Sequence, residues 1–77
     1  MNIIYNSEQY WVVEYPGGKG YELVDKRTAR GAYFQGDVAR SFAVSMQKAI
    51  AEEATVEHVD EFLDGYDVMF DLSVVYH

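Results

Sequence analysis

The chain has 77 residues, a formal net charge of −7 and no cysteine, and 49% of its residues are apolar. This length predicts one domain, residues 1–77, with enough apolar side chains for one core. The lack of cysteine excludes disulfides, a thiolate nucleophile and cysteine-ligated zinc or iron–sulfur clusters. The acidic charge disfavours nucleic acid as a partner, because such binding depends on Lys and Arg that neutralise phosphates.

The first seven residues lack the basic and apolar segments of a signal peptide. No apolar run approaches the roughly 18 residues that a membrane span requires. A secreted domain of this size usually needs disulfides. We therefore expect a cytoplasmic protein with no membrane partner.

The first half of the chain has the residue pattern of β-strands. Residues 3–5 form a short β-branched run, and residues 10–15 are aromatic and β-branched. The cluster Pro16-Gly17-Gly18-Lys19-Gly20 predicts a five-residue loop that joins the second strand to a third at 21–25. A second polar turn then leads to a fourth strand at 31–35.

The second half changes to a helical period. Asp37 is the expected N-cap of a helix over residues 38–52. The buried face of this helix is predicted from apolar residues at helical spacing, which are Val38, Phe42, Met46, Ala49 and Ile50. Thr55 is the expected N-cap of a second helix, whose apolar residues follow helical spacing from Val56 onward.

The sequence leaves two choices for the end of the second helix. Gly65 follows Asp64 and fits a C-cap, whereas the apolar spacing continues to about residue 69. We favour a helix to residue 69 and then a short strand, 72–76; the alternative is a helix that stops at 65 and a long strand. Either choice predicts an α+β fold, a small antiparallel β-meander of about four strands followed by two helices packed on one face.

Catalytic and cofactor motifs are missing from the sequence. The glycine cluster around Lys19 precedes a strand and has no Ser or Thr after the Lys, so it is not a phosphate-binding loop. His58 and His77 form no helical metal-binding pair. No serine lies in a nucleophile-elbow pattern. We therefore predict no catalytic residue, no cofactor, no metal site and no enzymatic activity.

The segment Arg30-Gly31-Ala32-Tyr33-Phe34 is similar to the strand of RNA-recognition motifs whose aromatic residues stack on bases. The element order of that motif is missing here. A small RNA-binding domain that uses Tyr33, Phe34 and the basic turn of residues 26–30 is therefore a minor alternative.

The second helix carries carboxylates at helical spacing, which we name the acidic stripe: Glu57, Asp60, Glu61, Asp64 and Asp67. We interpret it as a candidate docking face for a basic protein. It could also be a solvated face without a role, or a contact for the chain's own basic turn, residues 26–30. The many aromatic residues also suggest a homodimer, with Trp11 or Tyr10 as an exposed anchor, although we favour a core position for Trp11.

Four segments in fixed order carry a family resemblance: Tyr5-Asn6-Ser7, Gly20-Tyr21-Glu22-Leu23-Val24-Asp25-Lys26, Val59-Asp60-Glu61-Phe62-Leu63 and Val74-Val75-Tyr76-His77. Over nearly its whole length the chain resembles a family of short proteobacterial proteins, domain of unknown function 3567. The resemblance implies an intracellular bacterial protein made of this one domain, and it implies no activity, cofactor or catalytic residue. A weaker similarity is to small antitoxins with a β-β-β-α core.

The sequence thus favours a protein-interaction or adaptor module with an acidic helix face. The first alternative is an antitoxin-like inhibitor of a basic partner, and the second is the small RNA-binding domain.

Overall fold

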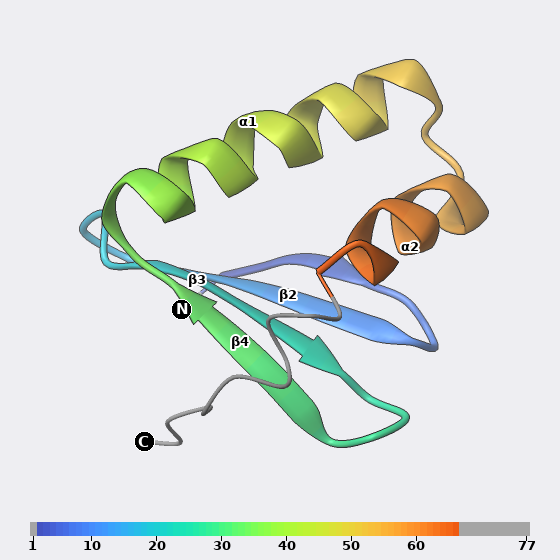
Figure 1. Cartoon of the computed structure of the whole chain (residues 1–77), viewed down its shortest axis with the longest axis horizontal. Helices are drawn as coiled ribbons and strands as arrows, with labels where there is room; N and C mark the ends of the chain where they lie inside the picture. Colours follow the sequence, from blue (N-terminus) through green and yellow to red (C-terminus); the bar gives the residue numbers. More distant parts are fainter. Residues whose placement is uncertain (1, 67–77) are drawn as a thin grey trace.

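The computed structural model describes residues 2–66, and within this range the chain forms four strands followed by two helices. The elements are β1 (Asn2–Asn6), β2 (Tyr10–Tyr15), β3 (Gly20–Asp25), β4 (Arg30–Phe34), α1 (Gly36–Glu52) and α2 (Val56–Asp64). The strands form an antiparallel sheet in the order β1-β2-β3-β4. Both helices lie on the same side of this sheet (Figure 1). The predicted α+β meander is confirmed, and the predicted strand 72–76 lies outside the described residues.

The turn between β2 and β3 depends on glycine. Gly17 and Gly18 have φ angles of 73° and 69°, and Gly20 has a φ of 113°, where other residues are strained. A Cβ atom on Gly20 would lie 2.0 Å from the backbone oxygen of Phe34. The glycine cluster therefore allows both the reversal of the chain and the close approach of the end of β4.

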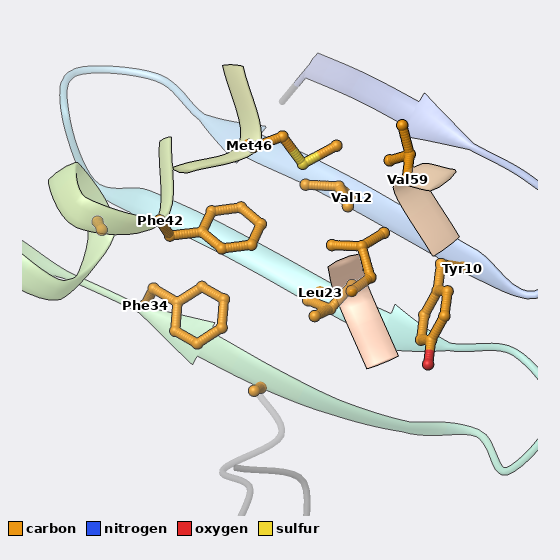
Figure 2. Close-up of a cluster of buried hydrophobic side chains, with 10 residues drawn as sticks. Tyr10, Val12, Leu23, Phe34, Phe42, Met46 and Val59 are labelled. Carbon is orange, nitrogen blue, oxygen red and sulfur yellow. The ribbon is translucent and has the colours of Figure 1, made fainter. Parts of the chain in front are cut away.

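The core lies between the sheet and the two helices. Side chains from the strands and from the helices point toward one another there (Figure 2), and they include Tyr10, Val12, Leu23, Phe34, Phe42, Met46 and Val59. All of these are at most 3% exposed. Because strand side chains alternate between the two faces of a sheet, these positions define the helix-covered face.

Phe42 of α1 is at the centre of an aromatic cluster in this core. Its ring centroid lies 4.8 Å from that of Phe34, 5.6 Å from Tyr21 and 5.3 Å from Tyr66. The tilted and edge-on arrangements are those that aromatic rings prefer. This cluster joins β3, β4, α1 and the residues after α2.

The start of α1 differs from the prediction. The N-cap is Gln35, whose carbonyl oxygen accepts the first helical hydrogen bond from the Ala39 N–H at 3.3 Å. Asp37 lies in the first turn instead and pairs with Arg40 on the surface. The reason is Gly36, whose φ of 60° lets the chain turn from β4 into the helix two residues earlier than expected.

The start of α2 is as predicted, because the Thr55 side chain accepts a hydrogen bond of 3.2 Å from the His58 N–H. The favoured end near residue 69 is wrong, since the helix ends at Asp64 and Gly65 is its C-cap. The N–H groups of Gly65 and Tyr66 bond to the carbonyls of Phe62 and Leu63, three residues back, which tightens the last turn. The tightened turn places Tyr66 in the aromatic cluster.

Candidate functional site

Asp60 of the acidic stripe faces the sheet. Its Oδ1 atom accepts hydrogen bonds from the Tyr5 hydroxyl at 2.8 Å and from the Ser7 hydroxyl at 2.9 Å. Burial and the bond to Asp60 raise the pKa of Tyr5 to about 12, because both favour the protonated phenol. Asp60 thus attaches α2 to the end of β1.

Asp64 has the same role one helical turn later. Its Oδ1 atom accepts hydrogen bonds from the Gln9 amide at 3.0 Å and from the Tyr10 hydroxyl. Burial and the bond to Asp64 raise the pKa of Tyr10 above its ordinary value. Asp60 and Asp64 therefore hold α2 against the first two strands and the loop between them.

The remaining residues of the acidic stripe have different positions. Glu57 and Glu61 are exposed, whereas Asp67 lies outside the described residues. The structure thus divides the stripe, because two of its carboxylates face the sheet and two face solvent. Docking of a basic partner stays a prediction that concerns Glu57 and Glu61.

A groove of about 530 Å³ runs beside the first turn of α2 and is lined by Ser7, Glu8, Gln9, Arg27, Val56, Glu57 and Asp60. Val56, which is 52% exposed, is the apolar residue of this groove. The groove brings three carboxylates together from the loop after β1 and from α2. It is the concave part of the acidic surface.

The basic turn after β3 reaches the same region. Arg27 pairs with Asp25 at 3.3 Å, and its guanidinium group lies 5.9 Å from the centre of the Tyr10 ring. Burial alone would raise the pKa of Asp25, but hydrogen bonds from the side chain and backbone of Arg27 outweigh it and hold that pKa below its ordinary value. Lys26 donates to the Ser7 carbonyl at 2.6 Å. The predicted intramolecular contact is therefore present in part, through residues that flank the groove.

The other side of the sheet is covered by no element within residues 2–66, and we call it the helix-free face. The strand register assigns to it two rows of side chains that run across the sheet. The first row contains Ile3, Val13, Glu22 and Tyr33, and the second contains Asn6, Trp11, Val24 and Gly31. Tyr15 lies beyond the first row on the same face. Ile3 and Tyr33, at the two ends of the first row, are 51% and 38% exposed.

A shallow apolar hollow of about 370 Å³ lies at the β2–β3 turn end of this face, lined by Tyr15, Pro16, Lys19 and Tyr33. The rings of Tyr15 and Tyr33 meet edge-on at 5.8 Å. The Tyr15 hydroxyl donates a 2.6 Å hydrogen bond to Glu22, which together with burial raises the pKa of Tyr15. The carboxylate of Glu22 is thus already bonded to a neighbour on the face.

Two aromatic predictions are wrong. Tyr10, suggested as an exposed anchor, is fully buried in the core. Trp11, which we favoured for the core, lies partly buried on the helix-free face because it alternates with Tyr10 and Val12. Its indole Nε1 atom has no hydrogen-bond acceptor among the residues that the structure describes.

The residues of the RNA alternative lie on opposite sides of the sheet. Tyr33 faces the helix-free side, whereas Phe34 is 1% exposed and packs against Phe42. A buried ring cannot stack on a base, so these two aromatic residues do not form one stacking surface.

Residues suited to metal binding are not grouped in the described part of the chain, where no cluster of three or more His, Asp or Glu is found. His58 is partly buried, and its Nε2 atom lies 3.5 Å from Glu52. No helix within residues 2–66 is long and apolar enough to cross a membrane.

Comparison with known proteins gives a family and one relative. The model of a family described as protein of unknown function (DUF3567) matches residues 1–77. Protein BTH_I0359 of Burkholderia thailandensis is 36% identical over 85 residues, in an alignment that covers 100% of both chains. No solved structure matches the chain.

Proposed function

The chain belongs to the DUF3567 family, and from its structure we propose that it acts by binding another protein through the helix-free face of its sheet. The observation that supports this most strongly is the one-sided cover of the sheet by α1 and α2. Large exposed apolar side chains on a soluble domain usually mark a binding surface when they are grouped. Ile3 and Tyr33 are such residues, and Trp11, Val24 and Tyr15 lie beside them.

The charge distribution supports the same surface. The chain has thirteen Asp and Glu residues, of which Asp67 and Asp71 lie outside the described range. Of those within residues 2–66, Glu22 alone occupies a strand position on the helix-free face. Interface centres are depleted of charged residues and enriched in Tyr and Trp, which is the composition of this face.

The acidic helix face is the second part of the proposed interaction module. Glu57 and Glu61 are exposed, and Glu57 lines the groove with Glu8 and Asp60. Basic side chains at the edge of a partner would be attracted there, which increases the association rate more than the final affinity. Inhibition of a basic toxin-like protein would be a special case of this contact. The proposal includes no catalytic step.

The test is affinity capture from the native host with the wild-type chain and two charge variants. Ile3→Glu places a carboxylate on the helix-free face, and Val44→Glu is its matched control on α1, at a residue that is 65% exposed. Proteins that bind through the face should be captured by the wild type and by Val44→Glu and lost with Ile3→Glu. Equal capture by all three chains, measured by quantitative mass spectrometry, would contradict the proposal.

The acidic part is tested with the double variant Glu57→Gln/Glu61→Gln. It removes two exposed charges and leaves the bonds of Asp60 and Asp64 to the sheet intact. We expect slower association at low salt and little difference at high salt, because screening removes the attraction. An association rate that matches wild type at low salt would confine binding to the helix-free face.

A further inference from the structure

We propose that the protein bound at the helix-free face is a second copy of this chain, stacked sheet to sheet. This inference rests on the proposed function, because it names the partner of the same surface. The two sheets would be related by a two-fold axis parallel to the strands. Such pairs of packed sheets are a standard way to bury two apolar sheet faces, which then lie about 10 Å apart.

The strand register makes the face self-complementary under this axis. The axis places β1 opposite β4 of the other copy and β2 opposite β3, while each row stays level with itself. Ile3 then faces Tyr33, which brings together the two exposed ends of the first row. In the second row Trp11 faces Val24, so a large side chain meets a smaller one.

The charge of the chain selects this face for self-association. Two copies with a net charge of −7 each repel one another, and carboxylates are spread over the helices and turns. The helix-free face is the large surface of residues 2–66 where identical chains can meet with one carboxylate each, Glu22, which already accepts a hydrogen bond from Tyr15. The remaining repulsion is long-range, so added salt should strengthen the pair, whereas it would weaken binding to a basic protein.

The size of the face sets the expected strength. Strands of five or six residues, placed side by side at about 4.8 Å, give a face about 19 Å on each side. This falls below the roughly 800 Å² per partner of a standard stable interface, which places the pair among weak, reversible complexes. We expect a dissociation constant on the order of 10–100 µM.

The first experiment is sedimentation equilibrium of the full chain up to about 500 µM, at low and at high salt. The mass should rise with concentration from 8.8 kDa toward twice that value, and the rise should be steeper at high salt. Ile3→Glu should weaken the pair by at least about 10-fold, and the control Val44→Glu should not. A single monomer mass under all conditions, or equal effects of the two variants, would overturn the inference.

The second experiment identifies the paired residues and does not depend on the stability of a charge variant. The chain has no cysteine, so Ile3→Cys and Tyr33→Cys each introduce one reactive thiol. Stacked sheets about 10 Å apart are too distant for a disulfide, and a short bis-maleimide reagent is therefore used. A mixture of the two variants should crosslink several-fold more than either variant alone. Crosslinking of the mixture no greater than that of Val44→Cys would exclude this geometry.

The outcomes separate the inference from the function on which it rests. If the chain stays monomeric but Ile3→Glu still loses a captured protein, the second copy is excluded and binding at the face stands. If the chain dimerises and Ile3→Glu and Val44→Glu dimerise as wild type does, the copies meet elsewhere, and the inference fails. If neither dimer nor captured protein depends on Ile3, both proposals fail.

Discussion

The Tyr5 hydroxyl on β1 donates a 2.8 Å hydrogen bond to the Asp60 carboxylate on α2, and this bond joins positions 55 residues apart. Ser7 donates to the same oxygen, and Tyr10 donates to Asp64 one turn later. Half of the carboxylates that Glu57, Asp60, Glu61 and Asp64 offer are thus used inside the fold. An acidic helix face in a sequence is therefore not equivalent to an acidic surface.

The first prediction concerns this attachment. Asp60→Ala should lower the free energy of unfolding by about 1–3 kcal/mol, because it leaves two partly buried hydroxyl donors without an acceptor. The neighbouring variant Glu61→Ala, at an exposed position, should change it by less than about 0.5 kcal/mol. Urea unfolding followed by tryptophan fluorescence measures both. Equal effects would show that the hydrogen bonds of Asp60 do not stabilise the fold.

The second prediction concerns alkaline pH. The pKa of Tyr5 is raised to about 12 in the folded chain, against 10.0 for a free tyrosine, so the folded state binds this proton more tightly. Its contribution to stability is complete below pH 10 and is lost as the pH rises from 10 toward 12. Allowing for solvent screening, the loss should be about 1–2 kcal/mol.

Tyr5→Phe is the matched variant for this pH effect. It cannot ionise, so the difference in unfolding free energy between wild type and variant should shrink across this pH window. Measuring both chains at each pH cancels the titration of the other groups. A difference that stays constant from pH 9 to pH 12 would count against the raised pKa of Tyr5.

The third prediction compares two glycines of one turn. Gly20→Ala should destabilise the chain by more than about 3 kcal/mol, because its Cβ would lie 2.0 Å from the Phe34 oxygen at a φ of 113°. Gly17→Ala, with no atom within 4 Å of its Cβ and a φ of 73°, should cost only about 1–2 kcal/mol. Thermal unfolding of both variants gives the comparison. A smaller cost at Gly20 than at Gly17 would show that β4 can move away.

The fourth prediction concerns the aromatic cluster. Phe42→Ala should cost about 3–5 kcal/mol, because a buried ring that contacts Phe34, Tyr21 and Tyr66 is replaced by a cavity. A chain of this length has only about 4–12 kcal/mol of total stability, so a substantial part would be lost. The exposed neighbour Val44→Ala is the control. Comparable unfolding midpoints of the two variants would contradict the central position of Phe42.

The secondary structure could be predicted because its signals are local. The alternation in 10–15, the glycines of 16–20 and the helical spacing after Gly36 depend on neighbours in sequence, and the structure has these elements within one or two residues. The helix end at Asp64 was harder, because continued apolar spacing competed with the Gly65 cap. Packing of Tyr66 into the aromatic cluster favours the earlier end, and that contact is not visible in the helical pattern.

The surfaces could not be predicted in the same way. Helical spacing places Asp60 and Glu61 side by side in the acidic stripe, yet the first faces the sheet and the second faces solvent. The two donors to Asp60 come from residues 53 and 55 positions away, so only the packing of α2 on the sheet distinguishes these carboxylates. A hint was present in the hydroxyls of Tyr5 and Ser7, which lie on a strand end that the helix covers.

The sequence by itself determined the order of strands and helices, the glycine turn and the absence of thiol chemistry, because these depend on residue type and on neighbours along the chain. The tertiary structure decided that Tyr10 is buried while Trp11 lies on the helix-free face, and which carboxylates remain exposed. Both outcomes depend on which face of the sheet the helices cover. Since alternation gives two equivalent faces, only the packing of α1 and α2 distinguishes them.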